Sequence, residues 1–357
     1  MLACAGALVR SCAGHSWSDN QNSPSCGCFD ASNGEAGRAS RGEYASKANS
    51  DRLRARAGAQ GERARRQGVG KADLKAAYSS LTPVTVEGQT LLFGYAPSQD
   101  HFDVYAFAAK APWLRPLPGK PKIGKGKDII NVFTLGNAPY VCGYTAKNGI
   151  FEISSVAKDL SLSAPYRFYR NHELAVSHDF TTLKPFTQFG QVAFLGYRGD
   201  NGYVAMYSLS VVVSSPAPGV PPLLMLPVWS HPWAPGWTRF AFFQLGGETF
   251  FFKTNTKVLN VNIDHVLDTL SAGTTEVGTL LQAQLPDALK ITNVEPIILS
   301  EAAPHFVTYI APTGAATVNR IHADCLGWTQ ALAFEAPAKA GVVTPVTLGE
   351  QAFLIFA

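Results

Sequence analysis

A strand that reads glycine, apolar run, tyrosine recurs along this chain, and its spacing constrains the fold more than any other feature. The clearest copies are GQTLLFGY, GNAPYVCGY and GQVAFLGY, which end at Tyr95, Tyr144 and Tyr197. Related segments follow as GETFFFKT, APHFVTY and EQAFLIFA. A similar strand therefore returns about every 50 residues, a period that is typical of repeat architectures.

Each copy lies between two further strands. An apolar strand precedes it, at residues 81–86, 129–135, 182–189, 238–245, 294–299 and 343–348. A third strand follows it, after a tight turn that contains Asn-Gly at 148–149 and at 201–202. Asn-Gly between apolar runs is the strongest short-range signal for a β-hairpin. The variable linkers between units have room for a fourth, outer strand.

Both faces of the repeated strand are apolar, which shows how the units pack. One face carries Phe93, Cys142, Leu195, Phe252, Val307 and Ile355, and the other carries Leu92, Val141, Phe194, Phe251, Phe306 and Leu354. A strand that is apolar on both faces is covered on both sides. Small antiparallel sheets stacked around an axis cover their central strands in this way. We therefore predict an all-β fold, a β-propeller of about six blade-like repeats with the last one incomplete. A β-sandwich is the alternative.

The basic charge is confined to the N-terminal part of the chain. Residues 1–80 carry twelve Lys and Arg against seven Asp and Glu, whereas residues 81–357 carry eighteen against nineteen. We predict that residues 1–78 form a disordered basic low-complexity tail with no strands to lend, and that residues 79–357 form the propeller. Because the body is nearly neutral, we expect it to bind no nucleic acid. The sequence gives no oligomeric state, and its cysteines do not indicate a compartment.

Two features bear on membranes and secretion. No apolar run approaches the roughly 18 residues that a membrane span needs, so none is expected. The opening MLACAGALVR lacks a basic start and is interrupted by Arg10, so it does not favour a signal peptide.

The fourth unit, GWTRFAFFQLGGETFFFKTNTKVLNVNIDHV, resembles a β-propeller repeat family of secreted bacterial proteins. The repeat of that family runs approximately G-W-T, then F-x-L-G-G, an aromatic strand and I-D-x-I. The matching residues are Trp237, Thr238, Phe243, Gly246, Gly247, Ile263 and Asp264. GWTQALAF at 327–334 repeats its opening, which would make Trp328 the equivalent of Trp237. The family is mostly uncharacterised, so the resemblance implies a propeller and an extracellular binding module but no reaction.

No catalytic signature is evident in the sequence. The S-x-D-x-G-x-x-W turn of sialidases is absent, and no Ser/His/Asp set can be assembled. Single acids such as Asp103, Glu152 and Asp264 fall on third strands, where solvent-facing positions are expected. No standard spacing of metal ligands occurs. We therefore expect no catalytic residue, no cofactor and no metal, and the balance is against an enzyme.

The leading functional prediction is a non-catalytic, lectin-like module that recognises a carbohydrate or protein ligand through aromatic pockets between blades. Sugar rings stack on aromatic side chains without needing a formal charge. The candidate ligand-binding residues are Trp233, Trp237, Trp328, Tyr144 and Tyr197. Two alternatives stay open, a propeller-fold glycoside hydrolase, which needs placed carboxylates, and a purely structural interaction scaffold.

Overall fold

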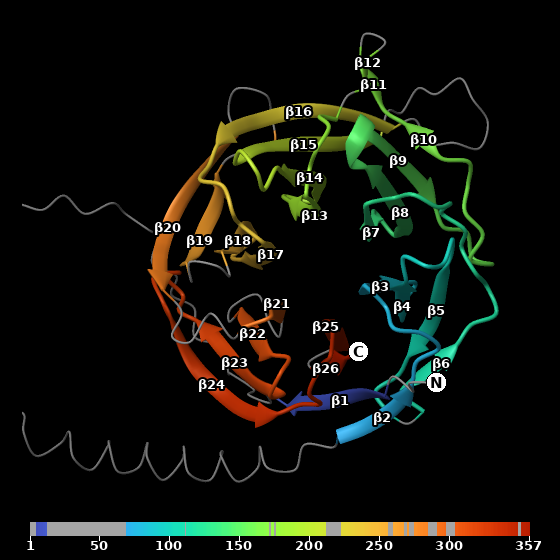
Figure 1. Ribbon diagram of the computed structural model, residues 1–357, viewed down its shortest axis with the longest axis vertical. Coiled ribbons are helices and arrows are strands. Elements are labelled where there is room, and N and C mark those ends of the chain that lie inside the picture. Colours follow the sequence, from blue (N-terminus) through green and yellow to red (C-terminus); the bar gives the residue numbers. More distant parts are fainter. Residues whose placement is uncertain are drawn as a thin grey trace, which may run out of the picture.

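The computed structural model describes residues 5–12, 69–110, 112–170, 173–174, 176–211, 223–255, 260–267, 270, 275–284, 291–297, 304–348 and 351–357. Within these ranges the chain forms six four-stranded antiparallel sheets. The sheets stand around a common axis as the blades of a propeller, with the first strand of each blade nearest the axis (Figure 1). The predicted β-propeller is confirmed, and no described helix is long and apolar enough to cross a membrane.

The blades follow one another along the chain, and each runs from its inner to its outer strand. Blade one contains β3 (Ser80–Val86), β4 (Gln89–Tyr95), β5 (Phe102–Phe107) and β6 (Leu114–Pro116), and blade two contains β7 (Ile129–Leu135), β8 (Ala138–Thr145), β9 (Ile150–Ser155) and β10 (Tyr166–Arg167). Blade three contains β13 (Thr182–Gln188), β14 (Gln191–Tyr197), β15 (Tyr203–Val211) and β16 (Leu223–Pro232), and blade four contains β17 (Arg239–Leu245), β18 (Glu248–Asn255), β19 (Asn260–Leu267) and β20 (Glu276–Gln284). Blade five contains β21 (Asn293–Ile297), β22 (His305–Ile310), β23 (Ala315–Ile321) and β24 (Trp328–Glu335). A short 3-10 helix, Ala146–Asn148, follows β8, and β11 (Tyr169–Arg170) pairs with β12 (Glu173–Leu174) outside the blades.

Blade six is completed by strands from the other end of the chain. Its inner strands are β25 (Val343–Leu348) and β26 (Gln351–Phe356), and its outer strands are β1 (Ala5–Cys12) and β2 (Val69–Asp73). β1 lies antiparallel to β26, with Ala7 opposite Phe356 and Arg10 opposite Phe353. The expectations that the last blade is incomplete and that residues 1–78 lend no strand are therefore wrong. The polar composition of residues 1–78 does not indicate a strand, but pairing with β26 supplies β1 with main-chain hydrogen bonds. The prediction of a disordered tail otherwise concerns residues that lie outside the described ranges.

In blades one and three, the glycine of the repeat makes room for a ring that enters from the linker before the blade, whereas Gly143 of blade two faces the side chains of Lys127 and Ile123. A Cβ atom at Gly94 would lie 2.8 Å from the ring of Tyr78, and one at Gly196 would lie 2.6 Å from the ring of Phe180. Both rings belong to the residue two positions before the inner strand of the same blade. Each of these two glycines therefore leaves the space that the neighbouring ring occupies.

Replacing Gly196 by valine should therefore destabilise the protein by about 1–3 kcal/mol or more, because the added methyl groups overlap the buried Phe180 ring. Urea denaturation measures the change in the free energy of unfolding. Gly278→Ala is the matched control, since a Cβ there meets only Leu267 Cδ1 at an ordinary 3.5 Å. Equal stability of the two variants would contradict this packing.

The tyrosine of the repeat ties its blade to the linker that leads into the next one. The Tyr144 hydroxyl donates to Ser177 O at 2.7 Å and accepts from the Phe180 N–H at 3.2 Å. Tyr197 makes the same pair of bonds, to Ala234 O at 2.9 Å and from the Trp237 N–H at 3.2 Å. Each hydroxyl satisfies two main-chain groups of a linker that would otherwise be unpaired. The recurrence of Gly and Tyr thus follows from building the same joint repeatedly.

Candidate active site in the axial channel

The six inner strands place one residue each at an equivalent level of the axis. Each of these residues lies opposite one residue of the apolar row on the second strand of its blade, namely Phe93, Cys142, Leu195, Phe252, Val307 or Ile355. The six are Thr82, Asn131, Lys184, Ala241, Glu295 and Thr344. Because the strands share one direction and register, any polar side chains among the six are gathered around one channel.

Two of these six side chains tie neighbouring blades together. Asn131 Nδ2 donates to Leu183 O at 2.7 Å, and Thr344 Oγ1 donates to Leu81 O at 2.8 Å. Glu295 and Lys184 form no such tie within the described part of the chain. Their charged groups are therefore left available to the channel.

Two adjoining cavities surround these charges. Their volumes are about 520 and 390 Å3, and Lys184, Arg239 and Glu295 line both of them. Ser80 and Asn131, from blades one and two, complete the shared polar wall. Lys184 and Arg239 are exposed, and Glu295 is half-buried. Three consecutive blades therefore direct two cations and one carboxylate at one space.

The electrostatics of Glu295 depend on this arrangement. Burial raises the pKa of Glu295, while the charges of Lys184 and Arg239 act in the opposite direction. Neither cation lies within the 4.0 Å of an ion pair with this carboxylate in the described structure. Arg239 instead spans to blade five, where its Nη2 donates to Thr292 O at 3.4 Å. Glu295 is thus a carboxylate with a raised pKa and no direct protein partner.

Such a group suits proton transfer. A general base works best when its pKa lies near the working pH, and burial is how proteins raise the pKa of a glutamate. Cations close to the reacting centre stabilise negative charge that develops there. The channel can therefore activate a water molecule at Glu295 and stabilise an oxyanion with Lys184 and Arg239.

The other carboxylate that lines a charged cavity and the acids of the third strands are engaged. Asp128 lines the larger cavity, but its Oδ2 accepts a hydrogen bond from Ala146 N at 2.7 Å. Asp103 accepts from the Tyr78 hydroxyl, Glu152 pairs with Lys127 and Arg167, and Asp264 pairs with Lys253. The expectation that the acids of the third strands face solvent is wrong, because all three are buried between blades.

The candidate tryptophans lie outside the axial channel. Trp237 is buried and Trp233 half-buried, and the Nζ atom of Lys253 lies 5.0 and 3.9 Å from their ring centroids. Trp328 packs against Phe306 at 5.5 Å between ring centroids. It begins the outer strand β24, whereas Trp237 precedes the inner strand β17, so the predicted equivalence of the two is wrong. The GWT at 327–329 follows a turn within blade five instead of opening a blade.

Tyr144 and Tyr197 have no exposed surface and make the inter-blade joints described above. Tyr197, Trp233 and Trp237 share one packed cluster where blades three and four meet, whereas Tyr144 and Trp328 lie elsewhere. That any of them binds a ligand stays a prediction.

The three charged residues of the channel were not among the candidates predicted from the sequence. The segments TLKPFTQF, TRFAFFQL and VEPIIL were interpreted as apolar strands, although each carries one charge. The available signal was a single charge in an otherwise apolar inner strand. Lys184 and Glu295 occupy the position where other blades have Thr, Asn or Ala, and Arg239 lies two residues before that position. Their convergence becomes visible only when the six repeats are arranged as a ring.

Comparison with known proteins gives the fold and no family. No family model matches the sequence, and no curated protein matches it. Among solved structures, a suspected 6-phosphogluconolactonase from Bacteroides fragilis matches with a TM-score of 0.50 at 12% identity, over 79% of this chain and 78% of that one. An exo-β-1,3-galactanase from Phanerochaete chrysosporium matches with a TM-score of 0.43 at 11% identity, over 78% of this chain and 66% of that one. At these identities the likeness shows the fold alone. The resemblance of the fourth unit to a family of secreted proteins stays a prediction.

These findings correct the leading functional prediction of a non-catalytic, lectin-like module. The Bacteroides fragilis protein that shares the fold is described as a suspected 6-phosphogluconolactonase. The charged groups of this chain converge on the axial channel, while the aromatic residues invoked for binding are engaged in packing between blades. The placement of these charged groups around one cavity agrees better with the enzyme alternative.

Proposed function

We propose that this protein is a hydrolase that acts on a carbohydrate-type substrate in the axial channel, with Glu295 as the general base. The observation that carries the proposal is the placement of Glu295, unpartnered and with a raised pKa, in a cavity that it shares with Lys184 and Arg239. A carboxylate withdrawn in part from water is costly without a direct partner, so its presence in a channel favours a chemical role.

Hydrolysis of a lactone, a cyclic ester of a sugar acid, fits one carboxylate and two cations. Glu295 takes a proton from water, and the water oxygen attacks the carbonyl carbon. The resulting oxyanion is stabilised by the positive charge of Lys184 and Arg239. The bond from the acyl carbon to the ring oxygen then breaks, and that oxygen receives the proton held by Glu295. The product is a hydroxy acid, whose carboxylate the two cations also favour.

Glycoside hydrolysis is the second candidate, because Asp128 lines the same cavity as Glu295. Most glycosidases use two carboxylates about 5–10 Å apart on either side of the scissile bond. Blade two, which follows Asp128, and blade five, which holds Glu295, stand three blades apart in the ring. The bond from Asp128 Oδ2 to Ala146 N holds this carboxylate to its own blade, which makes lactone hydrolysis the better fit.

A substrate panel tests the proposal with the full chain. Aldonolactones are followed by acid release in a pH-stat, and aryl glycosides by release of the phenol, each against the spontaneous rate. We expect turnover of a lactone well above background. Turnover of glycosides alone would replace the lead with the second candidate, and turnover of neither class would overturn the proposal.

Replacing Lys184 by methionine should lower kcat/KM for a turned-over lactone by about tenfold, because one cation that favours the oxyanion is lost. Since the charge of Lys184 lowers the pKa of Glu295, its removal should also shift the acidic limb of the pH–rate profile to higher pH. Lys158→Met is the matched control, because Lys158 is exposed and its ion pair in the described part of the chain is with Glu87, away from the axis. An unshifted limb in Lys184→Met would contradict the assigned arrangement.

A further inference from the structure

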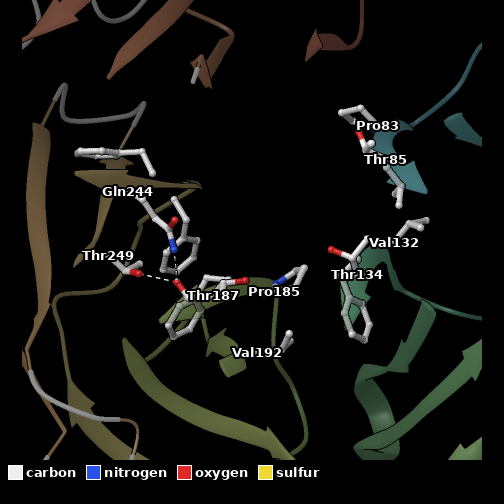
Figure 2. Close-up of a pocket in the computed structure, with 14 residues that line it drawn as sticks. Pro83, Thr85, Val132, Thr134, Pro185, Thr187, Val192, Gln244 and Thr249 are labelled. Atoms are coloured by element: carbon white, nitrogen blue, oxygen red, sulfur yellow. Dashed lines mark hydrogen bonds between the residues drawn. The ribbon is translucent and has the colours of Figure 1, made fainter. Parts of the chain in front are cut away.

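The axial channel continues past the charged cavities into a second chamber. This distal chamber has a volume of about 590 Å3 and is built mainly from the later residues of the inner strands of blades one to four, with Val192 and Thr249 from second strands (Figure 2). It shares Pro83, Val132, Pro185 and Phe242 with the smaller charged cavity. The two spaces therefore adjoin along the axis, and one extended molecule can occupy both.

The chemistry of the distal chamber differs from that of the charged cavity. Its described lining contains no charged side chain. Four polar side chains stand at equivalent positions of four consecutive blades, namely Thr85, Thr134, Thr187 and Gln244. A chamber lined by hydroxyl and amide groups without charge suits a neutral polar ligand and disfavours an ion.

Some of these polar atoms are free while others hold the wall in place. Gln244 Nε2 and Thr249 Oγ1 both donate to Thr187 O, at 3.0 and 2.5 Å, and Figure 2 draws these bonds. The Oγ1 atoms of Thr134 and Thr187 and the Oε1 atom of Gln244 have no hydrogen-bond partner within the described part of the chain. The main chain of Thr187 is thus fixed, and three polar atoms remain for a ligand.

An aromatic ring supplies a flat apolar surface beside them. Phe242 stacks on Phe186, with ring centroids 4.5 Å apart and planes 6° apart, and it remains half-buried where it lines the chamber. Hydroxyl groups around a flat apolar surface are the features with which proteins bind sugar rings, whose edges are polar and whose faces are apolar.

We infer that the distal chamber is a substrate subsite for an uncharged, hydroxylated ring. Together with the proposed hydrolase function, on which this inference rests, it makes the substrate at least a disaccharide-type molecule. Its reacting unit lies at Glu295, and its second ring lies between Thr134, Thr187 and Phe242. The enzyme would then prefer the lactone of a disaccharide acid to that of a single sugar.

Calorimetric titration of cellobiose tests the chamber directly, with no need for turnover. Wild type should bind it, and Thr187→Val and Thr134→Val should each weaken binding by about fivefold, the effect of one neutral hydrogen bond. Valine matches threonine in shape, and unchanged thermal melting shows that each variant is folded. Thr329→Val, exposed on the outer strand β24 and away from the axis, is the matched control and should bind cellobiose as wild type does.

Kinetics supply the second arm. The kcat/KM for cellobiono-lactone divided by that for glucono-lactone should fall several-fold in Thr187→Val. No cellobiose binding by wild type, or equal binding by wild type and both chamber variants, overturns the inference. Cellobiose binding that depends on Thr187 without turnover of any lactone or glycoside would sustain the subsite and overturn the hydrolase proposal, so the two failures are distinguishable.

Discussion

Replacing Glu295 by glutamine should lower kcat/KM for lactone hydrolysis by about 100- to 10,000-fold, the usual contribution of a positioned general base. Glutamine keeps the size of the side chain in the channel but cannot accept the proton of the attacking water. Because Glu295 makes no ion pair or hydrogen bond in the described structure, the substitution leaves no protein group without a partner. Steady-state kinetics, with the spontaneous rate subtracted, measure the loss.

Glu276→Gln provides the matched control, because Glu276 is exposed on the outer strand β20, away from the axis. It should retain wild-type kinetics. Thermal melting of Glu295→Gln should stay close to that of wild type, so the loss of activity is not a loss of fold. A positioned base contributes at least about 100-fold. If Glu295→Gln keeps more than about a tenth of wild-type activity, the loss is too small for that role, and Glu295 is not the general base.

The largest effect on stability is expected from Asp264→Ala, at about 3–5 kcal/mol in the free energy of unfolding. Asp264 is fully buried, and its carboxylate lies 2.6 Å from Lys253 Nζ. Burial raises the pKa of Asp264 and lowers that of Lys253, while each charge opposes the shift of the other. Removing the carboxylate leaves a buried ammonium beside the rings of Trp233 and Trp237 and deprives Thr279 Oγ1 of its acceptor.

The double variant Lys253→Met/Asp264→Leu separates the pair from its burial. A buried ion pair replaced by apolar residues of similar volume often costs little or nothing. Urea denaturation of wild type, the single variant and the double variant should therefore show the single variant as the least stable. A single variant within about 1 kcal/mol of wild type would show that Lys253 does not depend on Asp264, contrary to the expected cost of an unpaired buried charge.

The propeller could be predicted from the sequence because its signal is local and repeated. The two apolar rows of the second strand, seen in Phe93 and Leu92 and in their equivalents, follow from packing between blades and recur in every unit. The glycine before the tyrosine was also interpretable, since close approach by a ring is a local demand that Phe180 makes on Gly196.

Features that depend on closing the ring could not be predicted from local patterns. The pairing of Ala7 with Phe356 joins the two ends of the chain, and the polar, basic composition of the intervening tail hides the short apolar strand. The axial site has the same origin. Lys184, Arg239 and Glu295 lie on three different blades, and each appears singly in an apolar strand. Only the common register of the inner strands gathers them around one cavity.

The pH dependence of kcat/KM tests the role of Glu295 most directly. A general base must be deprotonated, so activity should rise as pH increases through the pKa of Glu295, and burial places that pKa above the ordinary value of 4.5. We predict a rising limb with its midpoint above pH 4.5 in wild type and no such limb in the residual activity of Glu295→Gln. A limb that persists unchanged in Glu295→Gln, or a midpoint at or below 4.5, would contradict the account.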